Sequence, residues 1–434
     1  MIGDTLSIQG GRSLQGEVTV RGAKNNFPKS LVAALLTSDP CRLRNISQIE
    51  DLEIVSGMLR ALGGDITIHD HDVEISLAKI HSATKESFQE FSGRSRIPIL
   101  FAGPLVARFG EAVIPKLGGC RIGSRPVDFH LAALREFGVS VEEDESFYFL
   151  KASKLCGAKI KLSYPSVGAT EQVLFSAVLA DGVTELANAA VEPEVMDLIA
   201  LLQKMGAIIS VDTDRVITIV GVKKMRGYDH TVMTDRLEVA SWACAAVATN
   251  GDVFVRGARQ LDMITFLNKF RQVGGEFDIE EAGIRFHRAN GVLQPLILET
   301  DVHPGFMTDW QQPFVILLTQ AEGVSVVHET VYENRFGYTS ALVQMGAHIQ
   351  LHRECLGSKK CRFGRRNHLH RAVISGPTKL HGAEIEIPDL RAGFSYVVAA
   401  LVAEGKSTIK NMATIKRGYE DIEGKLRGLG AQIV

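Results

Sequence analysis

A short pattern that recurs six times along the chain constrains its fold more than any other feature. Each copy consists of the end of a helix-like segment, a glycine, and a run in which apolar and polar residues alternate. The glycines are Gly63, Gly138, Gly206, Gly274, Gly346 and Gly430. Glycine suits the left-handed conformation that ends many helices, and the alternation predicts a half-buried strand. Six copies at nearly even spacing therefore indicate a structural repeat.

A second pattern, in which a glycine also precedes a strand-like run, lies between the copies of the first. Its glycines are Gly110, Gly182, Gly251, Gly323 and Gly405, and Pro40 takes this place in the first copy. Each repeat therefore reads as helix, turn, strand, loop, helix, turn and strand over about 70–80 residues. A repeat of this kind cannot bury both of its faces alone, so several must pack together.

The length of the chain sets the number of domains. With 434 residues it exceeds the size at which a single hydrophobic core keeps growing. We therefore predict an α/β protein with two domains of three repeats each, and a boundary near residues 228–236, where the third repeat has ended. The segment 5–20 precedes the first helix, and we expect it to return to the last repeat.

Composition and charge narrow the class of protein. Hydrophobic residues make up 45% and charged residues 23% of the chain, and the net charge is −2. This balance gives no basic surface for nucleic acid or an anionic membrane. The N-terminus lacks the apolar run of a signal peptide, no later stretch is long enough to span a membrane, and the six cysteines include no C-x-x-C pair. We expect a cytoplasmic enzyme with reduced thiols and no nucleic-acid, membrane or obligate protein partner.

Charged side chains occupy equivalent loops, just before or at the start of the first helix, in several repeats. Lys24, Arg125, Asp309 and Arg391 hold these positions. Cations gathered in this way suit a substrate with phosphate and carboxylate groups, and Asp309 suits a general base that accepts a proton from a hydroxyl. Three of these four residues also have a simpler interpretation. Lys24 and Arg391 are then solvated surface charges, and Asp309 is the N-cap of the helix that begins near residue 311.

The stretch LGGCRIGSRPVDF at 117–129 places Cys120 after two glycines and beside Arg121 and Arg125. Neighbouring positive charge stabilises a thiolate, so the stretch predicts a reactive cysteine on a mobile loop. The chain has no G-x-x-x-x-G-K-[ST], no G-x-G-x-x-G after a strand and no H-E-x-x-H. Nucleoside-triphosphate hydrolysis, dinucleotide redox chemistry and zinc hydrolysis therefore lose support.

One group of histidines and cysteines late in the chain raises the question of a metal site. It consists of His352, Cys355, Cys361, His368 and His370. The C-x5-C spacing fits no common zinc pattern, and the residues between the cysteines are strongly basic, which disfavours a cation. We interpret the segment 353–371 as a solvated basic hairpin and predict no metal site.

Eight short stretches run in order along the whole chain, and the pattern GGC-x-IG-x-RPVD at 118–128 among them is highly specific. The stretches are GAKN (22–25), GPLVARFG (103–110), GGCRIGSRPVD (118–128), PSVGATE (165–171), EPE (192–194), ENRF (333–336), DLRA (389–392) and RGYEDIEGKLRGLGA (417–431). Together they resemble the UDP-N-acetylglucosamine 1-carboxyvinyltransferase family of enolpyruvyl transferases.

The resemblance implies a fold of two similar domains, each an inverted α/β barrel of three repeats with helices inside, sheets outside and a substrate cleft between the domains. The domains are then residues 22–232, and residues 1–21 together with 233–434. The implied reaction transfers the enolpyruvyl group of phosphoenolpyruvate to the 3-hydroxyl of UDP-N-acetylglucosamine and releases phosphate. This is the first committed step of peptidoglycan synthesis, and it needs no cofactor.

The resemblance also implies roles for residues. Cys120 matches the general acid, which we expect the epoxide antibiotic fosfomycin to alkylate, and Asp309 matches the aspartate beside the sugar 3-hydroxyl. Lys24, Arg125 and Arg391 match residues that hold phosphoenolpyruvate or its developing charge. The residues that match nucleotide-sugar contacts are Asn25, Arg96, Arg125, Pro126, Val127, Asp128, Phe129, Ser166, Val167, Gly168 and Val331.

The sequence also departs from the family pattern, at Arg21, in NNFPKS after GAK, at Trp310 and in the long basic segment 353–371. Two alternatives therefore stand beside the main interpretation. One is the same chemistry on another uridine nucleotide in secondary metabolism, and the other is a catalytically silent paralogue that binds a nucleotide sugar. The intact catalytic positions argue against the silent paralogue, and the cysteine loop argues against the shikimate-pathway relative.

Overall fold

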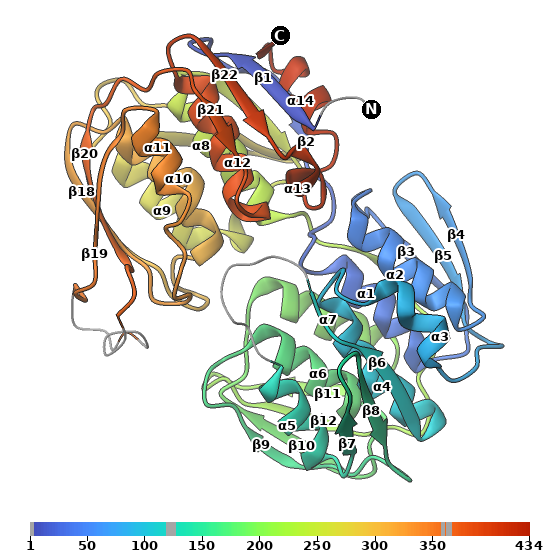
Figure 1. Ribbon diagram of the computed structural model, residues 1–434. Coiled ribbons are helices and arrows are strands. Elements are labelled where there is room, and N and C mark those ends of the chain that lie inside the picture. Colours follow the sequence, from blue (N-terminus) through green and yellow to red (C-terminus); the bar gives the residue numbers. More distant parts are fainter. Residues whose placement is uncertain (1–3, 119–126, 357–360, 362–366) are drawn as a thin grey trace. The chain divides into compact units, whose positions relative to one another are not determined.

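The structure is a computed structural model, which describes residues 4–118, 127–356, 361 and 367–434. These residues form two compact units (Figure 1). The first unit contains residues 22–118 and 127–233, and the second contains residues 4–21 and the described residues from 234 onward. The chain thus starts in the second unit, passes through the first and then returns.

The first unit contains three sheets, with strand orders β13-β3-β5-β4, β6-β8-β7 and β11-β12-β10-β9. Its strands are β3 (Cys41–Arg44), β4 (Asp65–His69), β5 (Asp72–Ser76), β6 (Glu111–Pro115), β7 (Ser140–Glu143), β8 (Phe147–Lys151), β9 (Lys159–Lys161), β10 (Val183–Ala187), β11 (Ile208–Val211), β12 (Ile217–Val220) and β13 (Asp229–Thr231). Its helices are α1 (Phe27–Ala33), α2 (Glu50–Ala61), α3 (Lys85–Phe88), α4 (Ala102–Phe109), α5 (Asp128–Glu136), α6 (Val167–Ala177) and α7 (Pro193–Lys204).

The second unit also contains three sheets, with strand orders β15-β16-β14-β2, β17-β18-β20-β19 and β21-β22-β1-β23. Its strands are β1 (Thr5–Gln9), β2 (Gln15–Thr19), β14 (Asp252–Arg256), β15 (Gly275–Glu280), β16 (Gly283–Arg288), β17 (Ile297–Glu299), β18 (Gly323–His328), β19 (His348–His352), β20 (Arg371–Gly376), β21 (Glu384–Glu386), β22 (Lys406–Lys410) and β23 (Gln432–Ile433). Its helices are α8 (Arg236–Ala248), α9 (Ile264–Val273), α10 (Gln311–Thr319), α11 (Thr339–Gln344), α12 (Leu390–Val402), α13 (Met412–Lys416) and α14 (Ile422–Gly428).

Each of the six repeats builds one sheet, so the prediction of an α/β protein with three repeats in each half is confirmed. The glycine of every copy of the first pattern follows a helix, precedes a strand and has a φ between 83° and 104°. A side chain at such a φ is strained, which explains why glycine recurs there. Within the described residues the strands form separate sheets of three or four strands, and no sheet closes into a barrel.

The N-terminal segment completes the second unit. Strand β1 pairs with β22 and β23 of the last repeat, as predicted, and β2 pairs in parallel with β14. In the first unit β13 plays a similar part, because it pairs in parallel with β3 and so joins the end of that unit to its beginning. Contacts between segments far apart in the sequence therefore close each unit.

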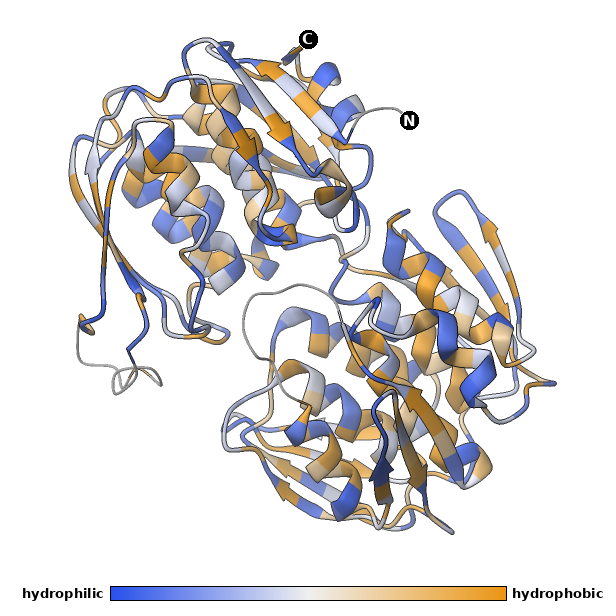
Figure 2. Cartoon of the chain, in the orientation of Figure 1, coloured by the Kyte–Doolittle hydropathy of each residue, from blue (hydrophilic) through white to orange (hydrophobic). Residues whose placement is uncertain are grey.

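Buried helices form the centre of each hydrophobic core. In the second unit α8, α10 and α12 pack against one another, and nearly all of their residues are buried. Apolar residues predominate on these helices (Figure 2), and the rings of Trp242 and Phe394 meet edge to face with centroids 4.8 Å apart. In the first unit α1 is buried along its whole length, and α6 is buried beyond its first turn. A helix that is buried on nearly every side must be enclosed by other elements, and the sheets of each unit contact these helices.

None of the helices in the described part of the chain combines the length and the apolar character that a membrane crossing requires.

Candidate active site

The residues that the sequence predicts for the site fall into three groups. Cys120, Arg125 and Pro126 lie outside the described residues. Lys24, Asn25, Arg96, the segment 127–129 and the segment 166–168 belong to the first unit. Asp309, Val331 and Arg391 belong to the second unit.

Lys24 is held by an ion pair in the first unit. Its ammonium group contacts the carboxylate of Asp51, in the first turn of α2, and the side chains are only 14% and 10% exposed. The second oxygen of Asp51 accepts a hydrogen bond from Ser95 Oγ at 3.0 Å, and Ser95 directly precedes Arg96. Burial opposes ionisation of Asp51, but the charge and hydrogen bond of Lys24 outweigh it and lower the pKa of Asp51. Lys24 is therefore not a solvated surface charge.

The loop that carries Asn25 is tied to two further helices. The ammonium group of Lys29, in α1, contacts the carbonyl oxygen of Asn25 and lies 3.5 Å from Glu171 Oε1 in α6. Asn26 Nδ2 donates a hydrogen bond of 2.9 Å to the carbonyl oxygen of Glu194 in α7. The buried start of α1 therefore fixes the backbone of this loop against α6 and α7.

Glu171 is a fully buried carboxyl group whose pKa burial raises to about 7, against an ordinary value of 4.5. The charge of Lys29 opposes the increase, and Glu192 and Glu194 add to it. The unfolded chain releases this proton near pH 4.5 and the folded chain near pH 7, so the folded state binds more protons between these values. The contribution of Glu171 to the free energy of unfolding therefore falls as the pH rises through this range.

We predict that Glu171→Gln makes the first unit relatively more stable as the pH rises. The free energy of unfolding of the variant minus that of the unmodified protein should increase by about 3 kcal/mol between pH 4.5 and pH 8. Denaturant unfolding at several pH values measures this difference. Glu185→Gln, on the exposed face of β10, is the control and should follow the unmodified protein. Parallel stability curves for Glu171→Gln and the unmodified protein would contradict the prediction.

The segments 127–129 and 166–168 lie on adjacent helices. Ser166 caps α6, because its Oγ accepts a hydrogen bond from the backbone N–H of Ala169 at 3.4 Å. A Cβ atom at Gly168 would lie 2.6 Å from Nε2 of His130 in α5, so the close packing of α5 on α6 requires glycine there. Asp128 at the start of α5 is exposed, and Val127 and Phe129 are half-buried.

Asp309 forms the centre of a buried charge cluster in the second unit. One of its oxygens contacts the guanidinium group of Arg335, and the other lies 3.5 Å from Nε of Arg391. The side chains of Arg335, Arg391 and Asp309 are 1%, 7% and 12% exposed. Burial disfavours the charge of Arg335, but Asp309, Asp389 and Glu329 outweigh it and raise the pKa of Arg335. The cluster holds the Asp309 carboxylate in one place.

The alternative role of Asp309 as a helix cap is wrong. Asp309 is the middle residue of a short 3₁₀ turn, η5 (Thr308–Trp310), that leads into α10. The N-cap residue of α10 is Trp310, and no side chain caps this helix. Asp389 is the carboxylate that caps a helix here. Its Oδ1 accepts hydrogen bonds from the backbone N–H groups of Arg391 and Ala392, at 2.9 and 3.1 Å, and so sets the position of Arg391 at the start of α12.

Glu329 connects Asp309 to Val331. Its Oε2 accepts a hydrogen bond from Thr308 Oγ1 at 2.9 Å, and its Oε1 accepts bonds from the backbone N–H groups of Val331 and Tyr332, at 2.8 and 3.0 Å. The carboxyl group is fully buried, which raises the pKa of Glu329 although these hydrogen bonds and Arg335 oppose the shift. The turn at 331–332 and the residue before Asp309 thus share one buried anchor.

Sequence reasoning missed several residues of these clusters, among them Asp51, Glu329 and Arg335. Arg335 lies in ENRF, one of the stretches that resemble the family, and this position could have identified it as a candidate site residue. Asp51 and Glu329 stand in no distinctive pattern, because an acidic residue at a helix start or after a strand is common at the surface. Only their burial and partners distinguish them.

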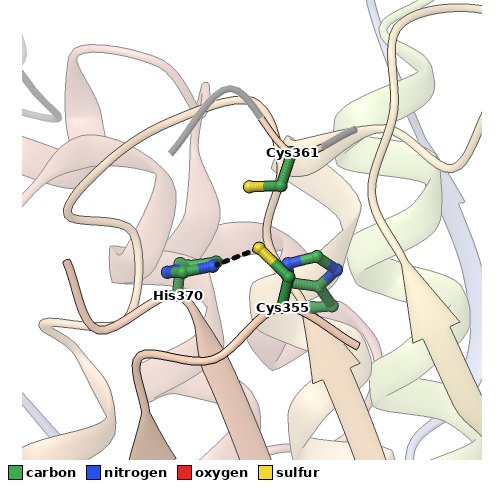
Figure 3. A group of neighbouring side chains, drawn as sticks. Cys355, Cys361 and His370 are labelled. Atoms are coloured by element: carbon green, nitrogen blue, oxygen red, sulfur yellow. Dashed lines mark hydrogen bonds between the residues drawn. The ribbon is translucent and has the colours of Figure 1, made fainter. Parts of the chain in front are cut away.

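The segment predicted to be a solvated basic hairpin contains a cluster instead. Cys355, Cys361 and His370 lie together with His328, and their ligand atoms are within 4.8 Å of one another (Figure 3). His370 is fully buried, so the solvated interpretation is wrong for this residue. His352 and His368, which the sequence grouped with them, are not members of this cluster. His328 was missed because it lies at the end of β18, far from the others in sequence.

The chain is similar to known proteins over almost its whole length. A family model described as EPSP synthase (3-phosphoshikimate 1-carboxyvinyltransferase) matches residues 8–426. The chain is 50% identical to UDP-N-acetylglucosamine 1-carboxyvinyltransferase of Protochlamydia amoebophila, over 99% of the chain and 94% of the relative. It is 46% identical to the protein of the same name from Chlamydia pneumoniae, over 97% and 92%.

A solved structure shares the fold. The enolpyruvyl transferase NikO from Streptomyces tendae has a TM-score of 0.85 at 23% identity, over 99% of this chain and 98% of that one. The fold similarity, the family model and the identity to full-length relatives agree. The chain therefore belongs to the UDP-N-acetylglucosamine 1-carboxyvinyltransferase family of enolpyruvyl transferases.

Proposed function

We propose that this protein transfers the enolpyruvyl group of phosphoenolpyruvate to the 3-hydroxyl of UDP-N-acetylglucosamine and releases phosphate. The observation that carries the proposal is the identity of 50% to a relative of that name over almost the whole of both chains. The reaction commits the nucleotide sugar to peptidoglycan synthesis, and we place it in the cytoplasm.

The chemistry is an addition followed by an elimination. The 3-hydroxyl oxygen attacks C2 of phosphoenolpyruvate, Asp309 accepts the hydroxyl proton, and Cys120 donates a proton to C3. A tetrahedral ketal results. Its C2–O bond to phosphate then breaks, C3 loses a proton, and the enol ether and inorganic phosphate are released. C3 gains one proton in the addition and loses one in the elimination. The reaction therefore balances without an oxidant, a reductant or a cofactor.

The geometry of the second unit supports the role of Asp309. A general base must stand in a fixed place to accept a proton, and the contacts with Arg335 and Arg391 restrict this carboxylate. Arg391, together with Lys24 and Arg125, is proposed to hold the phosphate and carboxylate of phosphoenolpyruvate. Fixed cations stabilise negative charge that develops during the reaction, because they need no reorganisation.

The nucleotide sugar is proposed to contact the remaining residues that the resemblance implies. They are Asn25, Arg96, Arg125, Pro126, Val127, Asp128, Phe129, Ser166, Val167, Gly168 and Val331. Two features support this assignment. The backbone of Asn25 is held by Lys29, and Gly168 packs closely on His130 of the helix that carries Asp128 and Phe129. Rigid backbone of this kind suits the recognition of a ligand.

Phosphate release with phosphoenolpyruvate and a panel of acceptors tests the proposal. UDP-N-acetylglucosamine should give the highest kcat/KM. A higher value with another uridine nucleotide would favour the alternative role in secondary metabolism. Binding of UDP-N-acetylglucosamine without any phosphate release would favour the catalytically silent paralogue.

A further inference from the structure

Four potential metal ligands converge at one end of the sheet β17-β18-β20-β19. His328 is the last residue of β18, Cys355 follows β19, and His370 directly precedes β20, while Cys361 belongs to the connection between β19 and β20. One ligand atom from each lies within 4.8 Å of the others. Figure 3 shows both sulfur atoms on the side that faces His370. The sheet therefore gathers two imidazoles and two thiols from three parts of the chain.

The hydrogen-bond partners of the two histidines place the ring proton on Nδ1, which leaves Nε2 able to bind a metal. His370 Nδ1 lies 2.8 Å from the carbonyl oxygen of His368, and a carbonyl can only accept, so Nδ1 carries the proton. His328 Nδ1 lies 3.0 Å from Glu299 Oε2, and this carboxylate oxygen accepts a hydrogen bond from the Nδ1–H group in the same way. In both neutral rings Nε2 then carries the lone pair. Metal-binding histidines in proteins commonly donate their second N–H to a carboxylate or a carbonyl.

His328 Nε2 is the strongest single indication of a ligand. The side chain is fully buried, and Nε2 has no hydrogen-bond partner among the described residues. A buried polar atom without a partner costs free energy comparable to a lost hydrogen bond. The rings of His328 and His370 lie with centroids 5.1 Å apart, so this nitrogen stands beside the other members of the cluster. A metal ion bound to Nε2 would remove the cost.

The distances agree with tetrahedral coordination. His370 Nε2 and Cys355 Sγ are 3.4 Å apart. Zinc–nitrogen bonds of about 2.0 Å and zinc–sulfur bonds of about 2.3 Å at tetrahedral angles place two such ligands about 3.5 Å apart. Two thiolates and two imidazoles form a common structural zinc set, and this set does not suit magnesium or calcium, which take oxygen ligands.

We propose that His328, Cys355, Cys361 and His370 bind one structural zinc ion, with Glu299 and the carbonyl of His368 as the outer hydrogen-bond partners. The basic residues around the cysteines do not oppose this. Two thiolates balance the charge of the ion, and nearby cations favour thiolates. Because all four positions are filled by protein, the ion is structural and takes no part in catalysis.

A zinc ion bound here would stabilise the backbone next to the proposed active site. The ion joins the end of β18 to both ends of the β19–β20 connection. Glu329 follows His328 directly, and its backbone N–H donates a hydrogen bond of 2.7 Å to the carbonyl oxygen of His370. Glu329 in turn anchors Thr308 and Val331. Zinc therefore supports the base of the turn that lies beside Asp309.

Metal analysis of the purified full-length protein tests the proposal. We expect one zinc ion per chain after preparation without chelator. Cobalt added to the chelator-treated protein should give the intense visible bands of a tetrahedral thiolate site, and the unfolding temperature should rise when zinc is restored. Protein that neither contains zinc nor gives these bands with cobalt would overturn the proposal, and this measurement does not depend on a variant that folds.

Variants locate the site. Cys355→Ser combined with Cys361→Ser should lose zinc, and His328→Asn should bind it at least about 10-fold more weakly. Cys156→Ser and His348→Asn, an exposed cysteine and an exposed histidine elsewhere, are the matched controls and should keep zinc. Full zinc content in the double cysteine variant would overturn the assignment. So would a disulfide between Cys355 and Cys361 in protein prepared under reducing conditions, which peptide mass analysis detects.

Discussion

Replacement of Asp309 with asparagine is expected to lower kcat by about 10²–10⁴-fold, the range that a positioned acid or base contributes to an enzyme reaction. Asparagine has the same shape and its amide oxygen can still accept a hydrogen bond from Arg335, but the amide does not accept the proton of the 3-hydroxyl. Phosphate release under saturating substrates measures the effect. Binding of UDP-N-acetylglucosamine, measured by calorimetry, should persist.

Asp252→Asn is the matched control. It removes a carboxylate that pairs with Arg285 at 3.0 Å on the surface of the same unit, and its kcat should stay unchanged. The thermal unfolding of both variants shows whether the fold is retained. Normal turnover in Asp309→Asn would exclude Asp309 as the base. A loss of turnover that accompanies unfolding would mean that the cluster with Arg335 and Arg391 serves stability alone.

Replacement of Cys120 with alanine is expected to have an effect of similar size, because it removes the proposed proton donor to C3. The same variant should lose the covalent adduct with fosfomycin. Arg121 and Arg125 flank this cysteine in the sequence, and nearby positive charge favours a nucleophilic thiolate that can open the epoxide of the drug. Intact-mass measurement of the unmodified protein should show one adduct.

Cys120→Asp distinguishes the two roles of the thiol. A carboxylic acid can still donate a proton, so this variant should retain activity and yet form no adduct. Cys156→Ser is the control and should form the adduct as the unmodified protein does. An adduct on another cysteine, or an inactive Cys120→Asp variant with a normal fold, would contradict the assignment.

The repeat and the candidate loops were predictable because their signals are local. A glycine after a helix reflects a backbone conformation of one residue, and alternation along a strand reflects which face that strand buries. Six such signals were enough to predict the six helix–glycine–strand units and their division into two groups of three. The positions of Lys24, Asp309 and Arg391 at equivalent loops followed from the same period.

The partners of those residues were decided by tertiary structure. Lys24 and Asp51, Asp309 and Arg335, and Glu329 and Thr308 come from separate loops and helices, and no period in the sequence relates them. A charge in a loop is compatible with solvent or with burial. Only the packing of the repeats determines which it becomes, because an ion pair is formed by whichever side chains the sheets and helices bring within reach.

The cysteine and histidine cluster is the clearest example of residues whose neighbours in space the sequence does not reveal. The sequence determined that Cys355, Cys361 and His370 are close along the chain, but their spacing fits no familiar metal pattern and their neighbours are basic. The fourth member, His328, joins them only because β18 pairs antiparallel with β20, so that the end of one strand lies beside the start of the other. The backbone conformation of single residues and the alternation of apolar and polar residues along a strand are short-range properties that the sequence determines by itself. The meeting of ligands from distant segments depends on the register of a sheet, which only the tertiary structure decides.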